Sequence, residues 1–186
     1  MPKSAGATPG PACYGRGGEQ ATVTDAYITA GLIAPQSFLG GTMRVYPELS
    51  RQAIDHLGER LGLSTLQTAD AIIQVTTSCI YAELLPQMAR RGVDPRGCSL
   101  LAYGGAGPTH AFMLARELPL RQVVVPPTPG ALCALGCLVA DMRADFVRTV
   151  WQDCADLTSA AIQEIYRQLD DEAHRWLEAE QTSVTR

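Results

Sequence analysis

The hydrophobic positions of the chain form several segments with helical spacing and two short segments without it. The longest helical segment covers residues 65–91 and is apolar on nearly every side. Because a helix with an apolar circumference is typical of a protein interior, we expect this helix to be buried. Ser64 is its predicted N-cap, and Pro86 is expected to kink the helix or end its regular part.

Two short apolar segments, residues 98–103 and 121–125, flank a helical pattern over residues 108–118. Two strands joined by a helix predict a βαβ unit with parallel strands and a right-handed crossover. The remaining patterns predict three more helices and a strand. One helix has its N-cap at Thr24 or Asp25, and the other two cover residues 47–61 and 129–140. The strand covers residues 145–152.

The last helical pattern begins at Thr158 and is amphipathic. One stripe is apolar and the opposite side is charged; the stripe consists of Ile162, Ile165, Tyr166, Leu169, Ala173, Trp176 and Leu177. No segment of this chain offers an obvious matching surface. We therefore expect the stripe to pack against another domain or subunit.

Composition indicates a globular chain, since 46% of the 186 residues are hydrophobic and 18% are charged. No apolar run reaches the ~18 residues that suggest a membrane span. The first 15 residues also lack the apolar segment of a secretory signal, so we expect a cytoplasmic protein. None of the six cysteines lies in a CxxC motif. We therefore expect free thiols, buried at Cys79, Cys98, Cys133 and Cys137.

The net charge of −4 is unevenly distributed, because residues 153–180 contain eight acidic and two basic residues. The absence of a basic stripe argues against nucleic acid as the main partner. Lys3 is the single lysine of the sequence. A GxxxxGK[ST] phosphate loop is therefore excluded, as is a Schiff-base lysine elsewhere in the chain.

Glycine and proline occupy eight of the first eighteen positions, which excludes a helix or a central strand there. This segment is either a flexible tail or a structured loop that faces a ligand. Cys13 and Tyr14 favour the structured loop, because both side chains are unusual in free solvent. The sequence does not define a role for either residue.

The most distinctive stretch is the glycine turn, Gly104-Gly105-Ala106-Gly107, between the predicted strand and the helix that Pro108 opens. A dinucleotide fingerprint is poorly matched, because the third glycine and the acidic residue after the second strand are missing. One interpretation is a backbone-only contact with adenosine or an α-phosphate. The other is a turn that only packs tightly, and both stay open at this point.

Two side chains are candidates for chemistry. Asp25 is able to orient a magnesium-bound water or a substrate N–H, or to cap a helix. His110 lies in the first helical turn after the glycines, where it either contacts a ligand or packs in the core. Cys133 and Cys137 share a helix face, but no histidine or carboxylate beside them completes a zinc site. We therefore predict no metal site.

Three long blocks of the sequence are unusual in composition: SAGATPGPACYGRGG, DPRGCSLLAYGGAGPTHAFMLAREL and VVVPPTPGALCALGCLVADMRADFVRT. They resemble the C-terminal part of the hydantoinase A/oxoprolinase family, which includes N-methylhydantoinase, 5-oxoprolinase, and acetone and acetophenone carboxylase subunits. The resemblance covers Ser4 to Thr149. It implies an α/β fold that is half of an actin/hexokinase-like, ribonuclease-H-like ATPase. Residues 1–20 are then a loop, residues 21–142 the C-terminal half of the ATPase domain, and residues 143–186 the start of a C-terminal domain.

The same resemblance implies that ATP and Mg²⁺ drive the opening of a cyclic amide, with Gly104, Gly105, Ala106 and Gly107 contacting adenosine. The family's Asp-Gly-Gly-Thr-type phosphate turns have no counterpart here. We therefore expect an oligomeric fragment that is inactive alone and depends on an N-terminal half and a second subunit. A ketone carboxylase subunit and a non-catalytic assembly fragment are the alternatives. The sequence does not distinguish hydantoin, 5-oxoproline and ketone substrates.

Overall fold

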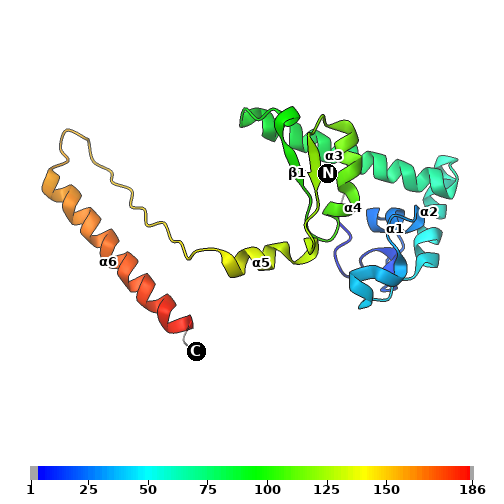
Figure 1. Ribbon diagram of the computed structural model, residues 1–186, viewed down its shortest axis with the longest axis horizontal. Coiled ribbons are helices and arrows are strands. Elements are labelled where there is room, and N and C mark those ends of the chain that lie inside the picture. Colours follow the sequence, from blue (N-terminus) through cyan, green and yellow to red (C-terminus); the bar gives the residue numbers. More distant parts are fainter. Residues whose placement is uncertain (1–3, 185–186) are drawn as a thin grey trace. The chain divides into compact units, whose positions relative to one another are not determined.

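The computed structural model describes residues 4–184, and the side chains of residues 4–180. It divides into two units, residues 1–136 and 137–186. The first unit is mixed α/β (Figure 1). Its elements, in order, are η1 (Ala12–Tyr14), α1 (Val23–Thr29), η2 (Pro35–Gly41), α2 (Pro47–Leu61), α3 (Thr65–Arg90), η3 (Pro95–Gly97), β1 (Ser99–Leu101), α4 (Gly107–Glu117), β2 (Gln122–Val124), η4 (Pro129–Ala131) and the first part of α5 (Leu132–Val139).

Side-chain caps determine where α1 and α3 begin. Thr22 and Asp25 form a capping box at α1, and Ser64 and Gln67 form one at α3. The prediction for Ser64 is confirmed. The prediction of Thr24 or Asp25 as the first cap is wrong, because Thr22 is the N-cap and Asp25 occupies the third helical position.

The hydrophobic core lies where α1, α2 and α3 meet. Its buried members are Ala26, Tyr27, Ile54, Ala69 and Ile73. A smaller cluster joins the N-terminal loop to α1 through Cys13, Ile28 and Val45. From residue 4 onward, the glycine-rich segment is therefore folded against the helices and is not a free tail.

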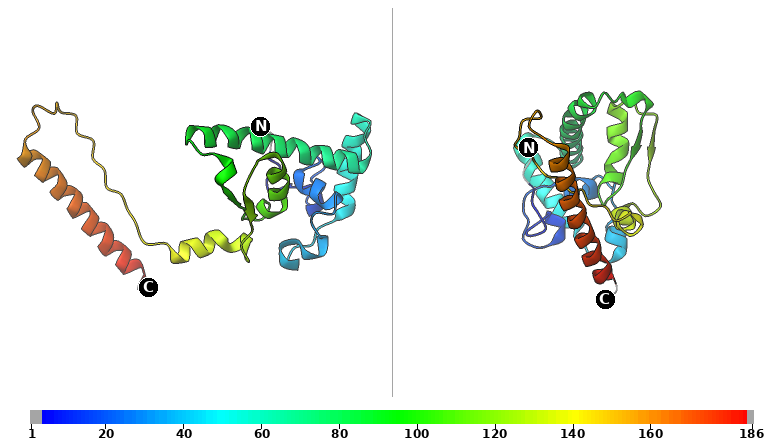
Figure 2. Two further views of the ribbon diagram at one scale, coloured as in Figure 1. Left: turned by 45° about the horizontal axis from the view of Figure 1, so that its top comes forward. Right: turned by 90° about the vertical axis from the view of Figure 1, so that its left-hand side faces the viewer.

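The predicted βαβ unit is present with parallel strands. Ser99 pairs with Gln122, Leu100 with Val123 and Leu101 with Val124, and α4 connects the two strands. Helix α4 contacts both α3 and β2, so it lies between them (Figure 2). The last residues of β1 and the start of α4 are thereby held close to the helical core.

Helix α3 continues through Pro86 to Arg90, so of the two outcomes expected at Pro86 the end of the helix does not occur. The burial of α3 departs from the prediction. Only Thr68, Ala69, Ile73 and Thr77 are buried, whereas Leu66 and Val75 are 63% and 60% exposed. The expectation of a buried helix is therefore wrong for the described residues. The apolar circumference shows how much surface the helix is able to bury, and the described residues of the first unit leave much of that surface uncovered.

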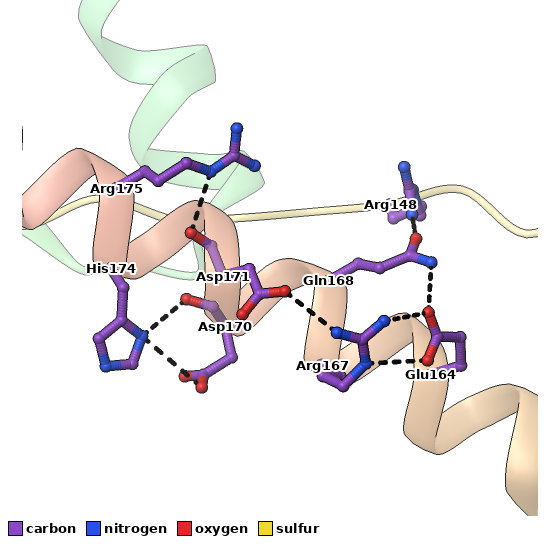
Figure 3. Close-up of polar contacts among 8 residues, drawn as sticks. All are labelled: Arg148, Glu164, Arg167, Gln168, Asp170, Asp171, His174 and Arg175. Atoms are coloured by element: carbon purple, nitrogen blue, oxygen red, sulfur yellow. Dashed lines mark hydrogen bonds and ion pairs between the residues drawn. The ribbon is translucent and has the colours of Figure 1, made fainter.

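The second unit contains the end of α5 and the long helix α6 (Ser159–Val184). Phe146 packs edge-on against Trp176 of α6, with 6.2 Å between ring centroids. On the polar side of α6, Arg167 pairs with Glu164 and Asp171 at 2.7 and 3.4 Å (Figure 3). The predicted strand over residues 145–152 is wrong: this stretch is irregular, and Trp151 is 93% exposed.

All six cysteines are free. Their expected burial is wrong at Cys79, Cys133 and Cys137, which are exposed, and at Cys98, which is intermediate. Cys13 is the buried thiol. Within residues 4–184, no helix is both long enough and apolar enough to cross a membrane.

Candidate functional site

Asp25 is the polar centre of the N-terminal region. Its Oδ1 accepts hydrogen bonds from the Cys13 N–H at 2.9 Å and the Ser50 hydroxyl at 2.7 Å. Its Oδ2 accepts from the Ala12 N–H at 3.2 Å, the Thr22 N–H at 3.0 Å and the Thr22 hydroxyl at 2.7 Å. The residue is fully buried, so this carboxylate ties the N-terminal loop, α1 and α2 together.

The electrostatics of Asp25 follow from these donors. Burial opposes ionisation, but the hydrogen bonds from Thr22, Cys13, Ser50 and Ala12 outweigh it and lower the pKa of the carboxyl. Burial and the adjacent Asp25 charge raise the pKa of the Cys13 thiol to about 12. Cys13 therefore remains a protonated thiol at neutral pH, which disfavours a nucleophilic role.

Close packing of glycines holds the same loop in place. A Cβ atom at Gly18 would lie 2.3 Å from the carbonyl oxygen of Gly10, and one at Gly15 would lie 2.8 Å from the Tyr46 ring. Gly15 also has a φ of +66°, which favours glycine. These positions admit no side chain, so the glycine-rich composition serves local packing.

An open groove of about 1190 Å³ runs between this loop and α3. Pro11, Tyr14 and Thr22 contribute to one wall, and Val75 and Cys79 to the other. The walls are mainly apolar, and the groove coincides with the face of α3 that the chain leaves exposed. The sequence carries no local signal for this groove, because the groove depends on the path of the N-terminal loop.

The glycine turn lies at the junction of β1 and α4. The Gly104 N–H donates to the Pro129 carbonyl at 2.8 Å, and Gly104 has a φ of +82°. A Cβ atom at Gly104 or Gly105 would meet no atom within 4 Å. At Gly107, the nearest atom to a Cβ would be the Ala102 carbonyl carbon at 3.9 Å. The turn is therefore open on its outer side, and its main chain is accessible.

His110 lies in the first turn of α4 and is buried, with 6% exposure. Its Nδ1 is hydrogen bonded to the Tyr27 hydroxyl of α1, and its Nε2 lies 3.1 Å from the Thr77 hydroxyl of α3. Burial lowers the pKa of the imidazole, which keeps it neutral. The sequence pattern indicated His110 but gave no signal for its partners Tyr27 and Thr77, which are distant in the chain.

The structure thus separates the predicted site residues into two groups. Asp25 belongs to the network of the N-terminal loop, whereas His110 joins the α4 side to α1 and α3. Among residues 4–184, no three His, Cys, Asp or Glu side chains are grouped so that they could hold a metal ion.

The fold and the open turn define an α/β protein whose strand–turn–helix junction leaves main-chain atoms accessible. The chain belongs to the hydantoinase/oxoprolinase family, since the family model matches residues 1–146.

It is 37% identical over 150 residues to caprolactamase subunit alpha of Pseudomonas jessenii, a match that covers 80% of this chain and 22% of that protein. It is 36% identical over 142 residues to the acetophenone carboxylase gamma subunit of Aromatoleum aromaticum, covering 76% and 19%. The crystal structure of the ATP-dependent caprolactamase from Pseudomonas jessenii superposes with a TM-score of 0.69 at 34% identity, covering 94% and 26%. The chain thus spans about a quarter or less of these relatives.

Proposed function

We propose that this chain supplies the adenosine-contacting part of an ATP-dependent enzyme that opens cyclic amides. The observation that carries the proposal is the open glycine turn between β1 and α4. It occurs in a family member similar to a caprolactamase that is described as ATP-dependent. Between the two interpretations of the turn, its accessible outer side favours ligand contact over tight packing.

The turn fits a nucleotide held by main-chain atoms. The turn carries almost no side-chain atoms, because it consists of Gly104, Gly105, Ala106 and Gly107. A sugar or base is therefore able to approach its backbone closely. N–H groups at the start of α4 are suited to donate to phosphate oxygens. When bound, ATP supplies the phosphoryl group that activates an amide toward ring opening.

We further propose that residues 21–142 form the C-terminal half of an actin/hexokinase-like ATPase domain. The phosphates would then be held by an N-terminal half, and a second subunit would complete the enzyme. The relatives named as subunits support this arrangement. On this proposal the isolated 186-residue chain binds adenosine nucleotides but does not turn them over.

The roles of Asp25 and His110 in catalysis remain predictions. The Asp25 carboxylate accepts five hydrogen bonds inside the protein, and both ring nitrogens of His110 are engaged. These contacts favour positioning roles for both side chains. Mg²⁺ commonly accompanies ATP and is held largely by phosphates and water. The proposal assigns it no ligand among the described residues.

Binding of ADP to the full 186-residue chain tests the adenosine contact by calorimetry. The informative variant is Gly105→Ala, because a Cβ there meets no protein atom within 4 Å and the fold should tolerate it. We expect its Kd for ADP to rise about tenfold through collision with the ligand. Gly97→Ala is the matched control, since a Cβ there is equally unobstructed and lies outside the turn. Equal Kd values for the two variants and the wild type would contradict the proposal, as would an absence of ADP binding.

The substrate class is tested by adding an N-terminal half and the second subunit in trans. We expect ATP-dependent ring opening with one of caprolactam, hydantoin or 5-oxoproline. ATP-dependent carboxylation of a ketone is the second candidate, which the 36% identity to an acetophenone carboxylase subunit supports. Carboxylation without ring opening would favour that second candidate. A complex that forms but lacks both activities would favour a non-catalytic assembly fragment.

A further inference from the structure

We propose that His110 is a positioning residue that holds the glycine turn, Gly104–Gly107, in register with the helical core through Tyr27 and Thr77. This inference rests on the proposed nucleotide contact at the same turn. It also makes a prediction about the turn itself that holds whether or not a nucleotide binds there.

The hydrogen-bond donors and acceptors define one tautomer. The Thr77 hydroxyl donates its single hydrogen to the Ile73 carbonyl at 2.8 Å, so toward His110 it acts as the acceptor. Nε2 of His110 therefore carries the proton, and Nδ1 accepts from the Tyr27 hydroxyl. In the opposite tautomer the Tyr27 hydroxyl hydrogen would have no acceptor among the hydrogen bonds of residues 4–184. This series of hydrogen bonds is complete only when Tyr27 donates to His110, His110 to Thr77 and Thr77 to Ile73.

These bonds connect three helices in a dry environment. Tyr27 is 4% exposed, and His110 and Thr77 are each 6% exposed. Loss of one partner would leave a buried polar atom unsatisfied, which is costly in a medium of low dielectric. Register between α4 and the pair α1–α3 is therefore specified by polar bonds as well as by apolar packing of Met113 on the core.

The link to the glycine turn is short. The His110 N–H donates to the Ala106 carbonyl at 3.2 Å, so the backbone of His110 is bonded directly to the turn. On its other side the turn is held by the bond from Gly104 to Pro129. A turn with a positive φ and three glycines has little intrinsic preference for one conformation. The buried His110 side chain, one helical turn away, supplies that preference through its bonds to Tyr27 and Thr77.

Two variant pairs test the inference in the full chain. Tyr27→Phe removes the donor to Nδ1, and its control Tyr46→Phe removes a hydroxyl for which the described residues show no hydrogen-bond partner. Thr77→Val removes the acceptor for Nε2–H. Its control is Thr76→Val, because Thr76 makes the same bond to the helix backbone, to Ile72 at 2.8 Å, without contacting a histidine.

Three readouts are measured on each protein: the ¹⁵N tautomer signature of His110, amide hydrogen exchange at Gly104 and His110, whose N–H groups hold the two ends of the turn, and the Kd for ADP. The signals of His110 are assigned among the three histidines with His110→Gln. In the wild type we expect the Nε2–H tautomer. In Tyr27→Phe and Thr77→Val we expect tautomer mixing, exchange at the turn faster by about tenfold, and a Kd about five- to tenfold higher, with the controls unchanged.

The outcomes separate the two proposals. A wild type that does not bind ADP contradicts the proposed function, and the exchange data then decide the positioning role alone. An Nδ1–H tautomer in the wild type overturns the inference, as does exchange at the turn that is equal in test and control variants. A rise in exchange at every amide of the unit indicates general destabilisation and also counts against a positioning role.

Discussion

The Ser50 hydroxyl of α2 donates to the Asp25 carboxylate of α1 across 2.7 Å, and both residues are fully buried. The same oxygen of Asp25 accepts from the backbone of Cys13. A single carboxylate thus joins two helices and the N-terminal loop. Buried charges persist only when such donors satisfy them, so this site is a centre of stability for the first unit.

Replacement of the carboxylate should be strongly destabilising. Asp25→Asn keeps the shape but places an amide N–H₂ against hydrogen-bond donors, and we expect it to lower the free energy of unfolding by about 3 kcal/mol. Urea unfolding of the full chain measures this change. Asp70→Asn is the control, because Asp70 is exposed and is bonded to Gln74 on the surface of α3. The control should change the free energy by less than about 0.5 kcal/mol. Similar losses in both variants would contradict the central role of Asp25.

Stability should fall as the pH drops below about 6.5, the ordinary pKa of histidine. Burial lowers the pKa of His110 in the folded chain, so the unfolded chain binds a proton first and acidification favours unfolding. The imidazole faces the Tyr27 hydroxyl of α1 and the Thr77 hydroxyl of α3, and neither group carries a charge at this pH.

Chemical denaturation of the wild type and His110→Gln between pH 8 and pH 5 checks this expectation. The wild type should lose stability over that range, and the variant should lose less. Below about pH 4, Asp25 should add a second loss in both proteins, since its pKa is lowered and it must be protonated in the unfolded chain first. Parallel profiles for the two proteins above pH 5 would show that His110 is not responsible.

Thiol reactivity should divide the cysteines by burial. The pKa of Cys13 is raised to about 12, so at pH 8 its thiolate is roughly a thousandfold rarer than that of an ordinary cysteine. We expect iodoacetamide to label Cys79, Cys133, Cys137 and Cys154, which are exposed, and to leave Cys13 unmodified until the chain unfolds. Peptide mass spectrometry measures the extent of labelling at each cysteine. Rapid labelling of Cys13 in the folded chain would contradict the burial of the loop.

The parts of the fold that the sequence predicted are those set by local chemistry. Ser64 and Gln67 form a cap because their spacing alone allows the reciprocal bonds. The two parallel strands follow from apolar segments joined by a helix, since each strand finds its neighbour within 25 residues.

The parts that were missed depend on contacts between distant residues. Residues 145–152 have strand-like composition, but a strand requires a neighbour to pair with, and this segment instead packs Phe146 on Trp176. Likewise, the periodicity of α3 does not reveal that Val75 would stay exposed. At the candidate site, Asp25 and His110 were identified from their positions beside turns and caps. Their partners Ser50, Tyr27 and Thr77 lie 25 to 83 residues away along the chain and have no local signature.

Two glycines inside helices should respond oppositely to alanine. Alanine normally stabilises a helix interior by up to about 1 kcal/mol relative to glycine. At Gly58 of α2, however, a Cβ would lie 2.6 Å from the Thr68 hydroxyl and 2.7 Å from the Leu63 carbonyl, so α2 and α3 would have to separate. We expect Gly58→Ala to lower the free energy of unfolding by about 2 kcal/mol despite the better propensity.

Gly136 of α5 is the matched case, because a Cβ there meets no atom within 4 Å. Gly136→Ala should therefore leave the free energy of unfolding unchanged or slightly raised, with a small gain in helical circular dichroism. Urea unfolding of both variants beside the wild type makes the comparison. A Gly58→Ala protein as stable as the wild type would mean that α2 and α3 do not pack as closely as described, and that the bond from Thr68 to Ser64 adjusts without cost.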